Sequence, residues 1–194
     1  MFEGIDRAGK STQCSRLIQA LEARGHRVRG LHFPVYDTEA GEILRRHVSG
    51  KAPLTPPTAH LMFAANRWEM VDEMRGMLDA GVTLVVDRYS FSGIAYSLAQ
   101  GLRPGFCRGT EEGLPRPDIV FHLRMDPEIA ATRAGYGQDL FDDIEFQKRV
   151  QAALDTHLTP NPLCRTLEVV GRDVDDIHES VMCEALSLFV GEGG

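Results

Sequence analysis

The stretch Gly4-Ile5-Asp6-Arg7-Ala8-Gly9-Lys10-Ser11 decides the fold, because it fits the pattern GxxxxGK[ST]. Glycines let the backbone of such a loop wrap around phosphate groups with its N–H groups pointing inward. Lys10 places a positive charge near the β and γ phosphates, and the Ser11 hydroxyl can ligate Mg²⁺. A helix that begins at Ser11 directs its positive end at the same anions. The stretch therefore predicts a phosphate-binding loop for a nucleoside triphosphate.

Apolar runs alternate with helical patterns along the rest of the chain. Helices are expected at 11–24, 39–48, 58–80, 90–100, 127–134, 141–157 and 175–190, and strands at 26–33, 82–86, 119–123 and 167–170. This alternation predicts a doubly wound α/β fold, with a parallel sheet flanked by helices and a ligand crevice at the carboxyl ends of the strands. Almost no sequence precedes the loop at Gly4, so the first of five strands is expected to be truncated in this chain.

Composition narrows the class of protein. A length of 194 residues fits one domain, and segment 101–118, with four glycines and three prolines, is expected to be a surface loop. A net charge of −7 argues against a nucleic-acid binder, and no apolar run approaches the ~20 residues of a membrane-spanning helix. Four scattered cysteines without a CxxC pair favour a reducing compartment. We expect the cytoplasm, with the nucleus or an organelle as alternatives.

Two arginines and one aspartate point to phosphoryl transfer. Asp87 ends an apolar strand, where a carboxylate can hold Mg²⁺ through water. Arg88 follows it and can grip an acceptor phosphate with its planar fork, although such a pair is often only a surface ion pair. Arg7 lies inside the phosphate loop, where it would act as an arginine finger on the transferring group; an exposed loop side chain is the plainer alternative.

Three stretches of the sequence together resemble the thymidylate kinase family, and most closely its eukaryotic branch. They are Phe2-Glu3-Gly4-Ile5-Asp6-Arg7-Ala8-Gly9-Lys10-Ser11-Thr12-Gln13, Phe63-Ala64-Ala65-Asn66-Arg67-Trp68-Glu69 and Asp87-Arg88-Tyr89-Ser90-Phe91-Ser92-Gly93. The resemblance covers nearly the whole chain. It implies a P-loop kinase that transfers the γ-phosphoryl group of ATP to dTMP with the help of Mg²⁺, in the supply of dTTP.

The resemblance also implies an acceptor pocket. Asp6 would reach the 3′-hydroxyl of the deoxyribose, and Phe63 would stack on the thymine ring. Arg67 would donate to a thymine carbonyl, and Arg88 would hold the 5′-phosphate. Tyr96 would pack near C2′ of the sugar and disfavour a ribonucleotide. For Phe63 and Arg67, the residues alone favour ordinary helix core and surface, and the family match reverses that reading.

On the donor side, the expected ATP-binding residues are Gly4, Arg7, Ala8, Gly9, Lys10, Ser11, Thr12 and Arg133. Ser11 and Asp87 are the expected metal ligands, and Arg7, Lys10 and Arg88 are the expected catalytic residues. A lid is expected at about 133–147, and its residues 134–142 contain no arginine. Within the family, such a lid accompanies an arginine in the phosphate loop.

Two positions depart from the family pattern. Two residues after Pro34, relatives usually carry a basic residue that helps to hold the dTMP phosphate, and this chain has Tyr36. Phe141 stands where relatives often carry a tyrosine. Other P-loop phosphoryl transferases, such as a deoxynucleoside kinase or another nucleoside monophosphate kinase, therefore remain the nearest alternative, and a nucleotide-binding regulator without turnover is a more distant one. The resemblance further implies a homodimer.

Overall fold

The strand that leads into the phosphate loop lies at the centre of the sheet. The computed structural model describes residues 1–133 and 140–189, and within them a five-stranded sheet has the order β2-β3-β1-β4-β5. All pairings are parallel. The strands are β1 (Phe2–Glu3), β2 (Val28–His32), β3 (Thr83–Asp87), β4 (Val120–Arg124) and β5 (Cys164–Glu168). The predicted doubly wound parallel sheet is confirmed.

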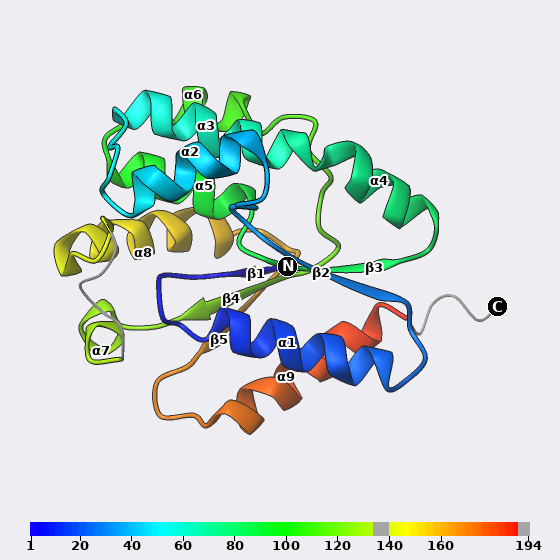
Figure 1. Cartoon of the computed structure of the whole chain (residues 1–194). Helices are drawn as coiled ribbons and strands as arrows, with labels where there is room; N and C mark the ends of the chain where they lie inside the picture. Colours follow the sequence, from blue (N-terminus) through cyan, green and yellow to red (C-terminus); the bar gives the residue numbers. More distant parts are fainter. Residues whose placement is uncertain (134–139, 190–194) are drawn as a thin grey trace.

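Helices cover both faces of this sheet (Figure 1). On one face lie α1 (Lys10–Glu22) and α9 (Val174–Ser187). On the other lie α2 (Glu39–Val48), α3 (Pro56–Glu69), α4 (Val71–Asp79), α5 (Ser90–Ala99), α6 (Pro104–Gly109) and α8 (Ile144–Leu158), whereas α7 (Pro127–Ala131) follows the end of β4. Because both faces are covered, four consecutive residues of β4 are buried. Among the described residues, no helix is both long and apolar enough to cross a membrane.

The helix expected at 58–80 is two helices, which corrects the sequence prediction. Helices α3 and α4 meet at Met70, which serves as the C-cap of one and the N-cap of the other. The first of them begins at Pro56, after Thr55, and not at Thr58. Proline is well tolerated in the first helical turn, where its missing N–H would have no partner. Pro56 and Pro57 therefore belong to the helix, although proline is typical of loops.

Segment 101–118 is not simply a surface loop, and that expectation was wrong. It contains the short helix α6 and buries the side chains of Cys107 and Leu114. Its second half is hydrogen-bonded to α3, because Trp68 Nε1 donates to the carbonyl of Thr110 over 2.8 Å. Strand β5 also begins three residues earlier than predicted, because it pairs with β4 from Cys164 onward.

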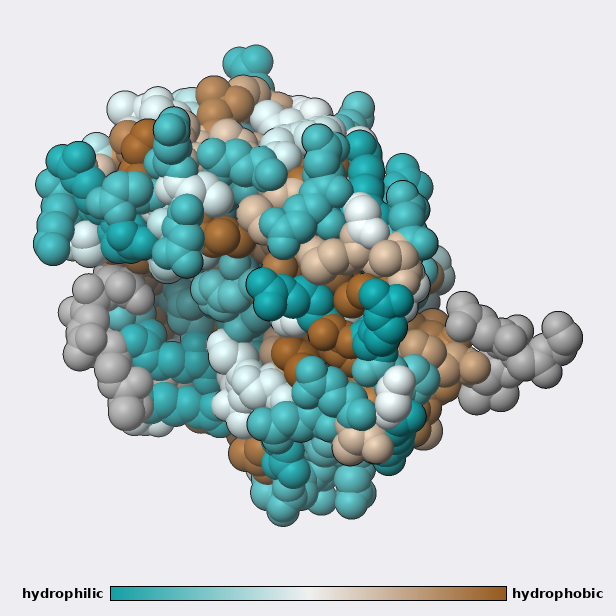
Figure 2. All heavy atoms as spheres, turned by 45° about the vertical axis from the view of Figure 1, so that its right-hand side comes forward, coloured by the Kyte–Doolittle hydropathy of each residue, from teal (hydrophilic) through white to brown (hydrophobic). Residues whose placement is uncertain are grey.

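Two hollows in the described part of the chain lie at opposite ends of the strands. The larger, of about 540 Å³, lies at the amino ends and is lined mainly by apolar side chains such as Leu21, Met74 and Leu78. Figure 2 shows this side of the molecule, where apolar atoms are framed by hydrophilic ones. The smaller, of about 220 Å³, lies beside Asp6 and Arg88 at the carboxyl ends. Ligands of open parallel sheets bind at the carboxyl ends, so the smaller hollow is the candidate site.

Candidate active site

The phosphate loop is shaped by backbone conformations that few residues adopt. Gly4 has φ +149°, and a Cβ there would lie 2.5 Å from the backbone oxygen of Leu123 in the neighbouring strand. Gly9 has φ +96° and is the N-cap of α1, which therefore begins at Lys10 with its first N–H groups facing the loop. Arg7 also has a positive φ, of 63°. Ala8, between Arg7 and Gly9, is buried. Thr12 lies exposed in the first turn of α1.

Lys10 is a buried cation at the start of α1. Its side chain returns to the loop, where Nζ donates to the backbone carbonyl of Ile5 over 2.6 Å. Burial, together with the charge of Arg88, lowers the pKa of Lys10 to about 8, although Asp6 and Asp87 act in the opposite direction. The lysine is thus close to its titration range in the absence of a bound anion, and a phosphate would stabilise its charged form.

Ser11, in the first turn of α1, lies next to Asp87, the last residue of β3. Ser11 Oγ donates to Asp87 Oδ2 over 2.5 Å. Asp87 Oδ1 is buried and has no hydrogen-bond partner in the described part of the chain. A hydroxyl and a buried carboxylate oxygen suit Mg²⁺, which usually takes one or two protein ligands and completes its shell with phosphate and water. Accordingly, residues 1–133 and 140–189 contain no cluster of three or more His, Cys, Asp or Glu side chains that could hold a metal.

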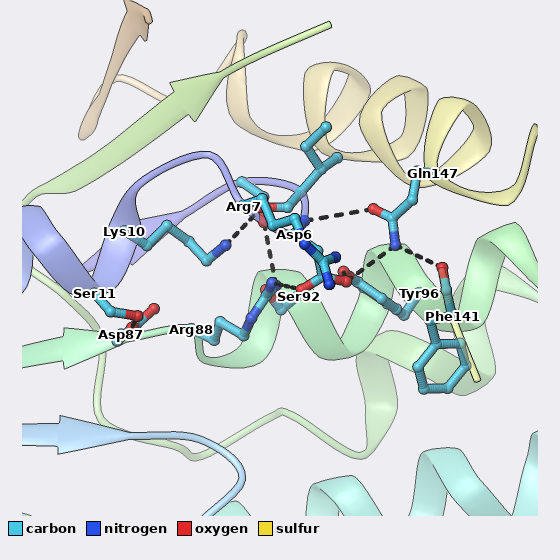
Figure 3. A network of polar contacts seen from close by, with 12 residues as sticks. Asp6, Arg7, Lys10, Ser11, Asp87, Arg88, Ser92, Tyr96, Phe141 and Gln147 are labelled. Carbon is cyan, nitrogen blue, oxygen red and sulfur yellow. Dashed lines mark hydrogen bonds and ion pairs between the residues drawn. The ribbon is translucent and has the colours of Figure 1, made fainter. Parts of the chain in front are cut away.

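Arg88 connects the loop to the smaller hollow. It has φ 63°, and its guanidinium donates to the carbonyl of Gly4 over 3.1 Å and forms an ion pair with Asp6 (Figure 3). Asp6 also accepts hydrogen bonds from Tyr96 Oη over 2.7 Å and from Gln147 Nε2 over 3.0 Å. Burial opposes ionisation of Asp6, but Arg88, Lys10 and these donors outweigh it and lower its pKa to about 2. Asp6 is therefore a carboxylate at neutral pH.

Glu3 fixes the start of α5, and sequence reasoning gave it no role. Its carboxylate is fully buried and accepts from the backbone N–H groups of Tyr89 and Ser92 over 3.0 and 3.2 Å. The hydroxyl of Ser92 donates to the same carboxylate. Because Arg88 immediately precedes this helix turn, Glu3 holds the backbone from which the Arg88 side chain projects.

Arg7 is paired with the far end of the expected lid. Its Nη1 and Nη2 lie 2.6 and 3.2 Å from the two carboxylate oxygens of Asp142. Arg133 also contacts the loop, because its Nη1 donates to the carbonyl of Arg7 over 2.7 Å. The predicted lid includes residues 134–139, which lie outside the described residues. Arg133, before residues 134–139, and Asp142, after them, therefore both contact Arg7.

The smaller hollow gathers the acceptor residues from five separate parts of the chain. Aromatic side chains and cations share its lining, which includes Asp6, Tyr36, Phe63, Arg67, Arg88 and Tyr96. Phe141 also lines it and meets the ring of Tyr96 edge-on, with centroids 5.5 Å apart. Tyr36 lies beneath the guanidinium of Arg45, whose Cζ is 5.4 Å from the ring centroid. All six side chains expected at the acceptor thus border one cavity.

Three residues that hold this arrangement together were missed by the sequence analysis. Gln147 bonds both Asp6 and the carbonyl of Phe141, Asp142 pairs with Arg7, and Glu111 pairs with Arg67. A buried arginine predicts a carboxylate partner, but the pattern does not say which one. Only the fold brings residues so distant in sequence into contact.

The chain is similar to known proteins over most of its length. Residues 2–181 match the family model described as thymidylate kinase. A thymidylate kinase of Danio rerio is 38 % identical over 99 % of this chain and 94 % of its own length, and one of Homo sapiens is 37 % identical over 93 % and 86 %. A solved thymidylate kinase from Candida albicans superposes with a TM-score of 0.87 at 29 % identity, over 96 % of this chain and 89 % of that one. The chain belongs to the thymidylate kinase family.

Proposed function

We propose that this protein transfers the γ-phosphoryl group of ATP to dTMP, giving ADP and dTDP. The single observation that carries the proposal is the position of Arg88, whose guanidinium is bonded to the phosphate loop at Gly4 and also lines the acceptor hollow. An anionic acceptor held there lies beside the donor phosphates. Family membership supports the choice of dTMP as that acceptor.

On the donor side, the loop from Gly4 to Thr12 would cradle the phosphates of ATP through backbone N–H groups and Lys10. Arg133, at the edge of the lid, would cover the adenine. Ser11 and Asp87 would hold Mg²⁺, which neutralises phosphate charge when it is bound. The buried, unpartnered Asp87 Oδ1 supports this assignment, since it offers an oxygen that no described group of the protein satisfies.

On the acceptor side, Phe63 would stack on the base, and Arg67 would donate to one of its carbonyl groups. Tyr96 would close the space beside C2′, because its hydroxyl is tied to Asp6 and its ring is packed against Phe141. The ionised Asp6 would accept the 3′-hydroxyl. Arg88 would hold the 5′-phosphate.

The reaction requires positioning more than proton transfer. An oxygen of the dTMP phosphate forms a bond to the γ-phosphorus as the bond to the β-bridging oxygen breaks, and ADP leaves with that electron pair. The attacking phosphate is already anionic near neutral pH, so no strong general base is needed. Lys10, Arg88 and Arg7 would stabilise charge on the equatorial oxygens. A lid at about 133–147, closing from Arg133 and Asp142, would exclude water and limit ATP hydrolysis.

The experiment that tests this function is an acceptor panel. ADP release from ATP and Mg²⁺ is measured with dTMP, dUMP, UMP, dGMP, thymidine and no acceptor. We expect dTMP to be the best acceptor, dUMP weaker and UMP weaker still. Faster turnover of thymidine would indicate a deoxynucleoside kinase, and faster turnover of dGMP another monophosphate kinase. ATP binding without turnover of any acceptor would favour a regulator.

The proposal also includes a homodimeric assembly and a cytoplasmic location. A homodimer is supported by the family resemblance and by exposed apolar side chains on α2 and α3, among them Ile43 and Leu61. Light scattering on the purified chain measures this, and a monomer mass at assay concentration would refute it. A cytoplasmic location is supported by the cysteines, which are free in the described part of the chain. A tagged copy of the chain in cells tests the location.

A further inference from the structure

Arg67 is held in one orientation by a carboxylate behind it. The guanidinium and the carboxylate of Glu111 form a two-pronged pair, in which Nε lies 2.8 Å from Oε2 and Nη2 contacts Oε1. The two side chains are only 3 % and 6 % exposed. This pairing occupies one edge of the guanidinium. Among the described residues, none accepts a hydrogen bond from the remaining nitrogen, Nη1, and Arg67 lines the acceptor hollow.

A glycine on α5 allows the guanidinium to lie where it does. A Cβ at Gly93 would lie 2.9 Å from Cζ and 3.0 Å from Nη1 of Arg67. Real Cβ atoms essentially never approach other atoms as closely as 2.9 Å, so any side chain at this position would displace the guanidinium. Gly93 also lines the hollow. The guanidinium is thus fixed between a carboxylate on one side and a bare helix backbone on the other.

Glu111 is itself anchored to the helix that carries Arg67. Thr110, its neighbour, has its hydroxyl 2.8 Å from His60 Nε2 and its carbonyl 2.8 Å from Trp68 Nε1. His60 and Trp68 both belong to α3, as Arg67 does. The segment after α6 is therefore attached to α3, and these contacts hold the Glu111 carboxylate beside Arg67. A surface loop without these contacts would not restrain a guanidinium in this way.

Resting on the proposed function, we propose that Glu111 is a positioning residue for base selection, with Gly93 as its counterpart across the guanidinium. The locked pair leaves Arg67 Nη1 as a fixed donor, which requires an oxygen acceptor on the edge of the base. A pyrimidine with a carbonyl group at position 4 supplies that acceptor. One with an amino group there sets donor against donor and leaves buried polar groups unpaired, which is costly.

The test uses dUMP and dCMP, which differ in the oxo or amino group at position 4. Glu111→Gln replaces one accepting oxygen with a donor and loosens the pair. Glu112→Gln makes the same change of charge at the next residue, which is exposed, and serves as the control. We expect Glu111→Gln to lower the dUMP-to-dCMP ratio of kcat/KM at least about tenfold. The KM for dTMP rises by a similar factor, whereas the KM for ATP and the control variant are unchanged.

Gly93→Ala tests the same idea from the other side, because it displaces the guanidinium and leaves the Glu111 carboxylate unchanged. Alanine is a better helix former than glycine, so thermal stability need not fall, and the variant decides the matter if Glu111→Gln does not fold. The same loss of selectivity is expected. Folded variants that keep the wild-type dUMP-to-dCMP ratio, or that lose both acceptors and ATP equally, would overturn the role of Glu111. Failure of the wild-type protein to phosphorylate dTMP would instead overturn the proposed function.

Discussion

The cations facing the donor phosphates and those facing the acceptor hollow are held in different ways. Lys10, on the expected donor side, is bonded to a neutral backbone carbonyl, and Arg7 is paired with the carboxylate of Asp142. On the acceptor side, both cations are paired with a carboxylate: Arg88 with Asp6 and Arg67 with Glu111.

This difference suggests that the two sets of cations affect different kinetic parameters. On the acceptor side, the two ion pairs are part of the fold, so we expect the binding of a monophosphate to cost little further side-chain freedom. On the donor side, we expect Lys10 and Arg7 to act on the charge that shifts between phosphate oxygens during transfer. We therefore expect changes in the loop to lower turnover and changes in the hollow to raise the KM for dTMP. Each prediction below tests this division, in order of expected effect.

The largest effect is expected from Arg7→Gly. Backbone N–H groups and Lys10 can bind the ground state of ATP without Arg7, whose guanidinium acts mainly on transition-state charge. Arginine fingers contribute about 10³–10⁵-fold, and we expect a loss in kcat near 10³-fold with little change in the KM for ATP. Steady-state kinetics with ATP and dTMP varied separately measure both quantities.

Lys10→Ala is the comparison for that variant, because it should also weaken ATP binding. A thermal melt of each variant checks that the fold is retained. If Arg7→Gly keeps near-normal turnover while the KM for ATP rises steeply, Arg7 is a binding residue. The expectation that changes in the loop lower turnover would then be wrong.

Arg88→Lys probes the acceptor side. Lysine keeps the charge next to Asp6 but cannot present a planar fork to a phosphate. Loss of one charge-assisted hydrogen bond, worth about 1.5–3 kcal/mol, raises the KM for dTMP about tenfold to hundredfold. The KM for ATP stays within about twofold of the wild type. The exposed Arg29→Lys, on β2, is the matched control. An equal rise in both KM values would contradict a separate acceptor role for Arg88.

The two sides also differ in how far the sequence predicts them. The donor loop is contiguous, so its pattern alone locates Lys10 and Ser11. Asp87 joins them because the carboxyl ends of neighbouring parallel strands meet at one edge of the sheet. The same rule brings Asp6 and Arg88 together. Local patterns and one topological rule therefore account for most of the loop.

The acceptor hollow is less predictable because its supports come from distant segments. Glu111 is 44 residues from Arg67, in a stretch whose glycines and prolines are typical of a loop. Burial of an arginine requires a carboxylate, but only the path of the chain after α6 determines which one approaches. Gln147, 141 residues from Asp6, was missed for the same reason. Propensity describes segments, whereas these contacts depend on how segments pack.

The dependence of kcat/KM for ATP on pH tests the role of Lys10 on the donor side. The pKa of Lys10 is lowered to about 8, chiefly by burial, so the free protein loses this charge as the pH rises through 8. Above that pH, kcat/KM for ATP should fall about tenfold per pH unit, because this parameter reports the free enzyme. Lys10→Arg keeps its charge at every pH tested and should remove the basic limb. A basic limb that persists in Lys10→Arg would assign it to another group.

The smallest effect is expected from Tyr36→Arg, at the edge of the acceptor hollow. The family resemblance implies a basic residue here, and the substitution would add a cation near the expected position of the dTMP phosphate. In this chain, however, Arg45 already lies over the Tyr36 ring, with its Cζ 5.4 Å from the centroid, and also donates to the Tyr36 carbonyl over 2.8 Å. We expect its charge, which is also paired with Glu42 and Asp37, to supply part of what the new arginine would bring.

We therefore expect Tyr36→Arg to lower the KM for dTMP by only about threefold, less than a full charge-assisted contact would give. The gain should shrink further at high salt, since exposed charges are screened. Arg45→Ala separates the two cations: in that background, Tyr36→Arg should produce a larger improvement than it does alone. Equal effects of Tyr36→Arg with and without Arg45 would mean that Arg45 does not act on the acceptor phosphate. The chain would then bind dTMP with a single locked cation, Arg88, at this end of the hollow.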